Sequence, residues 1–192
     1  PLTRIRLQLA LMESNTDTKS IGDDIREMET MIDGYITFAA GGGEEAPLET
    51  DLANLLDKMI TQAQRSHKFN IRLLPVKDEI PKFPVRKNAI QRAFSNIISN
   101  ATRYSSEMLV SIHKRNEEVF VTFDDNGAGI PEERRADAIR PFVRLEKSRN
   151  RRTGGTGLGL SITSDIILAH GGELSLGDSP LGGLRVVVKL PV

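Results

Sequence analysis

The chain lacks cysteine, a net charge and any long apolar segment. With no cysteine among its 192 residues it has no disulfide framework, thiolate metal site or cysteine nucleophile, which is compatible with a reducing compartment. Lys and Arg number 26, as do Asp and Glu, so net charge gives no reason to expect nucleic acid or a membrane surface as a partner. No apolar run approaches the roughly 18 residues of a transmembrane helix, and no signal peptide is visible. These absences predict a soluble, intracellular chain.

Two glycine-rich segments stand out. Residues 153–159 lead directly into an apolar helical pattern, where glycines let backbone N–H groups approach phosphate and the helix N-terminus favours an anion. Residues 144–152 before it are not strand-like, and no Gly-Lys-Ser/Thr sequence follows, so neither a dinucleotide fingerprint nor a Walker loop fits. Upstream, the alternating residues 119–123 end in Asp125-Asn126-Gly127-Ala128-Gly129. A carboxylate there can accept a hydrogen bond from an exocyclic amine such as that of adenine.

A third segment has the apolar period of a helix. Asn96 and Asn100 lie four residues apart and share one face of it. Amides on the buried side need hydrogen-bond partners, at a cost of roughly 1 to 3 kcal/mol when these are missing. Their oxygens suit hydrated magnesium beside phosphates. The helical period is set by Ile90, Phe94, Ile97, Ile98 and Ala101.

Together these segments resemble the ATP-binding domain of sensor histidine kinases, in the superfamily shared with gyrase, Hsp90 and MutL. Residues 96–104 resemble its N box, residues 125–129 its first glycine box, residues 141–144 its F box and residues 155–160 its second glycine box. Residues 170–172 and 182–191 are similar to the end of its last helix and to its closing strand. The sequences of these motifs most resemble those of the EnvZ type of osmosensor kinase.

The resemblance implies ATP and Mg²⁺ as cofactors. Asp125 would bind the adenine amine, and Asn100, helped by Asn96, would hold Mg²⁺. Residues 130–153 have little periodicity and much charge, so they would form a mobile lid over the nucleotide. Its Arg144, Lys147, Arg149, Arg151 and Arg152 either reach phosphates or remain solvated. The nucleotide-binding residues implied are Asn96, Asn100, Arg103, Tyr104, Asp125, Gly127, Gly129, Ile130, Phe142, Gly155, Thr156, Gly157, Leu158, Gly159 and Leu160.

The implied reaction is phosphoryl transfer from ATP to a histidine and then to an aspartate of a response regulator. Residues 1–5 resemble the end of the phosphoacceptor box, whose histidine would lie five residues before Pro1 and is absent from this sequence. The chain is therefore expected to bind ATP without phosphorylating itself at the usual site. His67, His113 and His170 are explained as solvated residues or as a helix-terminal cation. The intact protein would be a bacterial inner-membrane sensor, with this chain in its cytoplasmic part and the membrane reached only through upstream segments.

The N-terminal residues predict a helical hairpin. An apolar stripe at Leu2, Ile5, Leu9 and Met12 is interrupted at residues 15–17 and continues in a second helix. One narrow stripe buries little surface, so pairing of two copies into a four-helix bundle, and thus a homodimer, is expected. Leu7 and Leu11 are expected to point away from this stripe. They either dock the receiver domain of a response regulator or pack against the hairpin loop or the ATP-binding domain. The second helix carries Ile21, Ile25, Met28, Ile32, Tyr35 and Ala39.

The predicted fold class is α+β. The hairpin would span residues 1–40, a flexible linker residues 41–47, and an α/β sandwich that binds ATP residues 48–192, with helices on one face of a mixed sheet. Helices are expected near 52–64, 85–104 and 159–169, and strands near 70–76, 108–114, 119–125, 173–176 and 184–190.

Three other functions stay open. A gyrase- or Hsp90-type ATP hydrolase shares the fold, but such families carry a glutamate at the position of Asn96, and an amide cannot be the base that activates water. An anti-sigma-factor serine kinase lacks the helical hairpin. A non-catalytic dimerisation and docking module fits a chain without the phosphoacceptor.

Overall fold

The computed structural model describes residues 45–66, 69–77, 79–143 and 157–192, together with residues 18, 21, 22 and 25. Several predictions from sequence lie outside these residues. They are the helical hairpin as a whole with Leu7 and Leu11, His67, the basic residues between 144 and 152, and Gly155 and Thr156 of the second glycine box.

The centre of the fold is a five-stranded mixed sheet in the order β2-β4-β5-β7-β6. β2 runs parallel to β4, and the remaining neighbours are antiparallel. The register places Asp124 opposite Arg185, so the glycine box after β5 lies beside the turn that precedes β7. The strands are β2 (Asn70–Leu73), β4 (Glu107–Arg115), β5 (Glu118–Asp125), β6 (Glu173–Asp178) and β7 (Leu184–Pro191).

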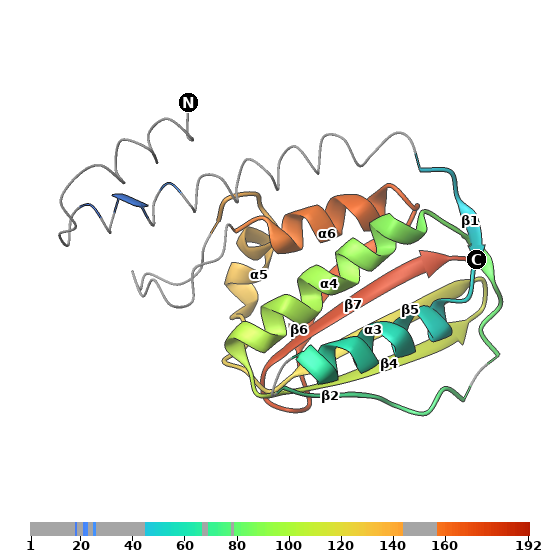
Figure 1. Ribbon diagram of the computed structural model, residues 1–192, viewed down its shortest axis with the longest axis horizontal. Helices are drawn as coiled ribbons and strands as arrows, with labels where there is room; N and C mark the ends of the chain where they lie inside the picture. Colours follow the sequence, from blue (N-terminus) through green and yellow to red (C-terminus); the bar gives the residue numbers. More distant parts are fainter. Residues whose placement is uncertain are drawn as a thin grey trace.

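Three helices lie over one face of this sheet, as predicted (Figure 1). These are α3 (Leu52–Ser66), α4 (Lys87–Tyr104) and α6 (Gly159–Leu168). α4 and α6 lie side by side and point in opposite directions, so the N-terminus of α4 meets the C-terminus of α6 (Figure 1). None of the helices in the described ranges is long and apolar enough to span a membrane.

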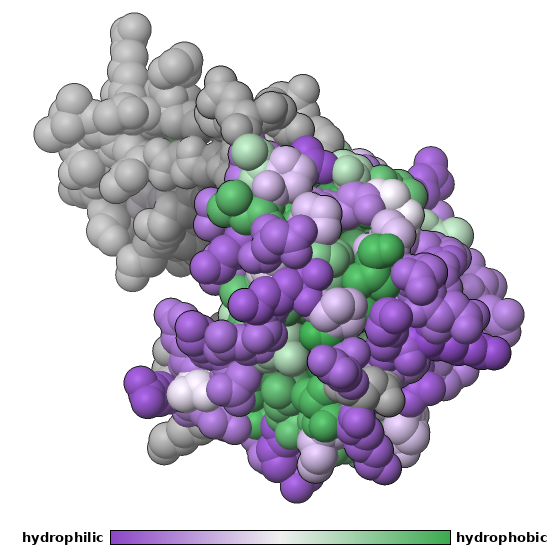
Figure 2. All heavy atoms as spheres, turned by 90° about the vertical axis from the view of Figure 1, so that its right-hand side faces the viewer, coloured by the Kyte–Doolittle hydropathy of each residue, from purple (hydrophilic) through white to green (hydrophobic). Residues whose placement is uncertain are grey.

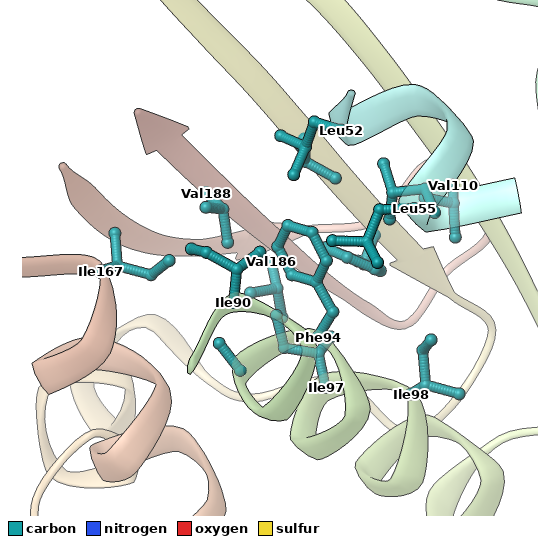
Figure 3. Close-up of a cluster of buried hydrophobic side chains, with 14 of the residues drawn as sticks. Leu52, Leu55, Ile90, Phe94, Ile97, Ile98, Val110, Ile167, Val186 and Val188 are labelled. Carbon is teal, nitrogen blue, oxygen red and sulfur yellow. The ribbon is translucent and has the colours of Figure 1, made fainter. Parts of the chain in front are cut away.

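The core fills the space between these helices and the sheet (Figure 3). Phe94 of α4 and Phe123 of β5 are both fully buried, and their ring centroids lie 5.4 Å apart. Each buried side chain of this size stabilises the fold by roughly 1.5 to 3 kcal/mol relative to an exposed one. The apolar residues whose helical period predicted α4 therefore form the face of α4 that contacts the core. The buried residues of α4 are Ala89, Ile90, Ala93, Phe94, Ile97, Ile98 and Ala101.

Two predictions about elements were wrong, one helix boundary lies two residues from its predicted place, and one pair of short strands was not predicted. The region expected as a lid contains α5 (Glu132–Ala138), which begins after Pro131 with two glutamates that suit a helix N-terminus. No pattern in the sequence predicted the short antiparallel pair of β1 (Leu48–Thr50) and β3 (Phe83–Val85). α4 consequently begins at Lys87 rather than near residue 85, since Phe83 and Val85 are buried as alternate residues of a strand. β2 ends at Leu73 rather than near residue 76; the Leu74 N–H still donates to the Val110 carbonyl oxygen (2.8 Å), and residues 74–76 are exposed.

Candidate nucleotide-binding site

Asp125 ends β5 and is only 6% exposed. Its Oδ1 accepts hydrogen bonds from the backbone N–H of Gly127 (2.8 Å) and of Leu184 (3.0 Å). Oδ2 accepts no hydrogen bond from any residue that the structure describes. One carboxylate oxygen is thus fixed by the fold, and the other remains as an acceptor for a ligand.

The glycines around Asp125 are required by close contacts. A Cβ on Gly127 would lie 2.7 Å from the carbonyl oxygen of Tyr104, and one on Gly183 would lie 2.3 Å from Oδ1 of Asp125. Gly129 has a φ of 69°, in the left-handed region that favours glycine. Gly183 and Leu184 therefore belong to the site, although sequence reasoning assigned them only to the closing strand. The Gly182-Gly183 pair before that strand was the available signal.

Asn126 fastens the first glycine box to the junction of α4 and β4. Its Oδ1 accepts the backbone N–H groups of Ser106 and Glu107, both at 3.0 Å, and its Nδ2 donates to Oγ of Ser106 (3.0 Å). This link brings the end of α4 to the carboxylate. Arg103 and Tyr104 lie in the last turn of α4 and are exposed, so both side chains are available to a ligand.

Asn96 and Asn100 are half-buried at the rim of α4, not on its buried side as predicted. The difference follows from helix geometry, because the core face is taken by Ile97, Ile98 and Ala101. Nδ2 of Asn96 donates to the carbonyl oxygen of Gly159 (3.3 Å), which joins the N box to the start of α6. The Asn100 side chain makes no hydrogen bond with any described residue, so its amide oxygen fits a magnesium ligand.

The F box contacts the second glycine box. The backbone N–H of Phe142 donates to the carbonyl oxygen of Gly157 (3.1 Å), and a Cβ on Gly157 would lie 3.0 Å from the carbonyl oxygen of Val143. Phe142 itself has a φ of 63° and is 58% exposed. Leu158 is buried, whereas Gly159 and Leu160 are half-buried in the first turn of α6.

Ile130 follows the first glycine box and is half-buried. Its carbonyl oxygen accepts a hydrogen bond from Nε of Arg135 in α5 (3.0 Å), and Arg135 also pairs with Asp178 at the end of β6. The stretch between the two glycine boxes is therefore attached to the sheet at this point.

An ion pair beside the site joins β5 to β7. Nε and Nη2 of Arg185 donate to the two carboxylate oxygens of Asp124 at 2.8 and 2.9 Å. The hydrogen bond with Asp124 raises the pKa of Arg185 above its ordinary value. Because this pair lies one residue from both Asp125 and Leu184, it reinforces the strand register on which the fixed carboxylate depends.

His170 was predicted to be a solvated residue or a helix-terminal cation; it follows the end of α6, but its ring is half-buried rather than solvated. The half-buried ring accepts the backbone N–H of Arg86 at Nε2 (3.0 Å), and Nδ1 lies 2.6 Å from the carbonyl oxygen of Ile166. Burial lowers the pKa of His170, and the nearby charge of Arg86 adds to this effect. The neutral ring with a proton on Nδ1 satisfies both contacts. His113, by contrast, is exposed as predicted and stacks on Phe120 with 5.1 Å between centroids.

Acid should therefore weaken the contact between α4 and α6. The folded pKa of His170 lies below its ordinary 6.5, so its stabilising contribution is present above about pH 6.5 and is lost as the pH falls below that value. We expect the melting temperature to fall more between pH 7.5 and 5.5 in the wild type than in His170→Gln, whose amide oxygen can still accept the Arg86 N–H. If the melting temperatures of the two proteins fell equally, protonation of His170 would not be the cause of the loss of stability in acid.

Comparison with known proteins shows the family of the chain. The family model described as "Histidine kinase-, DNA gyrase B-, and HSP90-like ATPase" matches residues 85–192. The sensor histidine kinase CpxA of Escherichia coli K12 is 33% identical over 205 residues, covering 100% of this chain and 44% of CpxA. The sensor histidine kinase GtrS of Pseudomonas aeruginosa is 31% identical over 191 residues, covering 100% of this chain and 39% of GtrS. The chain thus spans less than half the length of these curated relatives.

Solved structures share the fold. The ATP-binding domain of PrrB from Mycobacterium tuberculosis superposes with a TM-score of 0.56 at 26% identity, over 76% of this chain and 96% of that domain. Full-length ShkA in complex with AMPPNP gives a TM-score of 0.72 at 21% identity, over 95% of this chain and 40% of ShkA. The chain belongs to the family of histidine kinase-, DNA gyrase B- and HSP90-like ATPases, and sensor histidine kinases are among its curated relatives.

Proposed function

We propose that the chain binds Mg-ATP as the cytoplasmic kinase region of a two-component sensor, which passes the γ-phosphoryl group to a histidine and then to an aspartate of a response regulator. The observation that carries ATP binding is the divided role of the Asp125 carboxylate, with Oδ1 fixed by two backbone N–H groups and Oδ2 left as an acceptor. An acceptor fixed in this way suits the exocyclic amine of adenine. The AMPPNP complex of ShkA, a protein of the same fold, supports this proposal.

In this proposal each group of the site positions the nucleotide. Asp125 orients the adenine, and Gly127 leaves room for the base, because any side chain there would meet the Tyr104 carbonyl. Asn100 holds Mg²⁺, which when bound neutralises charge on the phosphates. Asn96 is already hydrogen-bonded to the Gly159 carbonyl and so holds the start of α6 against α4, one helical turn from Asn100. As an amide it is no base for water, which favours a kinase over an ATP hydrolase.

Replacement of Asn100 tests the magnesium ligand. In calorimetry, Asn100→Ala should lower the affinity for ATP in the presence of Mg²⁺ by roughly tenfold, as loss of a group that supports a metal commonly does. The same variant should bind ATP without Mg²⁺ as the wild type does. Ser99→Ala, an exposed neighbour on α4, is the control and should change neither affinity. Failure of the wild type to bind ATP at all would contradict the proposed function itself.

Homodimerisation through the hairpin and docking of the regulator at Leu7 and Leu11 remain part of the proposal. The helical period predicts that both leucines point away from the dimer seam formed by Leu2, Ile5, Leu9 and Met12. Leu7→Ser/Leu11→Ser should therefore keep the mass of a dimer in light scattering and the wild-type affinity for ATP, while binding of the cognate receiver domain weakens. Dissociation into monomers, or unchanged receiver binding, would place the docking surface elsewhere.

A further inference from the structure

The first turn of α4 is capped by residues that are distant in sequence. Arg86 occupies the N-cap position but forms no side-chain capping bond. The orphan N–H groups of Asn88 and Ala89 instead donate to the Glu45 carboxylate, to Oε1 at 2.8 Å and to Oε2 at 3.1 Å. A carboxylate at this end also complements the helix dipole. Glu45 is therefore attached to α4, although the sequence placed it within a flexible linker of residues 41–47.

The contacts beside Glu45 join β1 to β3 and the start of α4 to the end of α6. Leu48 pairs with Val85 in the β1–β3 ladder, the Arg86 N–H donates to His170, and Nη2 of Arg86 donates to the Ala169 carbonyl (2.6 Å). Figure 1 shows β1 beside the N-terminus of α4. The residues of α4 that are proposed to bind the nucleotide lie in the middle and at the C-terminus of this helix. Figure 2 views the molecule from the side of β1, where polar side chains surround separate apolar patches. Loss of the Glu45 contact alone would leave the ladder and the core intact.

We propose that the contact of the Glu45 carboxylate with α4, here called the strap, fixes the point at which the preceding polypeptide leaves the ATP-binding body. With the strap closed, the predicted linker is shortened from residues 41–47 to residues 41–44. Opening it frees three residues, which extend the reach of the body by about 10 Å. This inference concerns delivery of the nucleotide and rests on the proposed function only for its effect on phosphoryl transfer.

The length of a linker sets the effective concentration of the group it carries. We take the four-residue linker as the one whose length matches the span to the phosphoacceptor, and beyond that length the concentration falls with about the −3/2 power of linker length. A change from four to seven residues then lowers delivery by roughly two- to threefold. The affinity for ATP should not change, because within the described ranges Glu45 hydrogen-bonds to the N-terminal turn of α4 and acts by its charge on His170, whereas Asn96 and Asn100 lie in later turns of α4.

The strap itself is tested by a spin label. The chain has no cysteine, so Ala46→Cys, at an exposed position, takes a single nitroxide. Electron paramagnetic resonance should show restricted motion at residue 46, which becomes fast when Glu45→Ala is added. Glu49→Gln removes a nearby exposed carboxylate of β1 and should leave the motion restricted. Equal label mobility with and without the Glu45→Ala change would overturn the strap.

The consequence is tested in the longer protein that includes a phosphoacceptor histidine. Transfer of the γ-phosphoryl group from ATP to that histidine, with release of ADP, should be two- to threefold slower with Glu45→Ala at an unchanged KM for ATP, and unaltered with Glu49→Gln. An unchanged rate, or a change in KM instead, would overturn the role of the strap in delivery. Absence of any ATP binding would reject the proposed function, whereas the spin-label result would still decide whether the strap exists.

Discussion

Asp125→Asn should weaken ATP binding by about 1 to 3 kcal/mol, or roughly five- to 150-fold. The asparagine oxygen can replace Oδ1 and still accept the N–H groups of Gly127 and Leu184. Its amide nitrogen would then take the place of Oδ2 and bring a donor toward the exocyclic amine of adenine, which is itself a donor. The affinity loss should therefore come with little change in the melting temperature of the nucleotide-free protein.

Calorimetry with ATP and Mg²⁺ measures this change. Asp57→Asn provides the control, because Asp57 is an exposed carboxylate of α3 and its neutralisation alters charge without touching the site. An unchanged affinity in Asp125→Asn would remove Asp125 from the adenine contact. A large decrease in the melting temperature would instead indicate that the carboxylate acts mainly on the fold.

Sequence reasoning could relate residues to one another where they lie within one contiguous segment. Asp125 ends an alternating strand and Gly127 follows two residues later, and Asn96 and Asn100 lie one turn apart on a strongly periodic helix. Local geometry is enough to relate the members of such pairs. The strand order, by contrast, puts β7 between β5 and β6, and only this non-local pairing brings Leu184 to Asp125. That contact between residues 59 positions apart leaves no periodic signal in the sequence.

The missed elements are short or depend on distant partners. β1 and β3 have three residues each, too few for an alternating pattern to be recognised, and they exist because they pair with one another. α5 has seven residues with little apolar content, and its link to Asp178 is made through Arg135. His170 was misread for a similar reason, because its partner Arg86 lies 84 residues away. Sequence periodicity finds faces that are buried, but it does not identify the partner of a polar group.

Gly183→Ala should both destabilise the fold and abolish tight ATP binding. Its Cβ would lie 2.3 Å from Oδ1 of Asp125 and 2.4 Å from the backbone nitrogen of Gly127, so either the carboxylate or the glycine box has to move. Overpacking of this kind costs about 1 to 3 kcal/mol in unfolding free energy, measurable by urea denaturation. Because the displaced atoms are the ones that orient Oδ2, ATP affinity should fall even under conditions where the variant is fully folded. The matched control is Gly177→Ala in β6, where the new Cβ would meet only the Cβ of Arg185 at 4.0 Å and both measurements should stay near the wild type. A folded Gly183→Ala protein with wild-type affinity for ATP would show that the nucleotide does not depend on the Asp125–Leu184 contact, and the adenine site would have to be sought away from the β5–β7 junction.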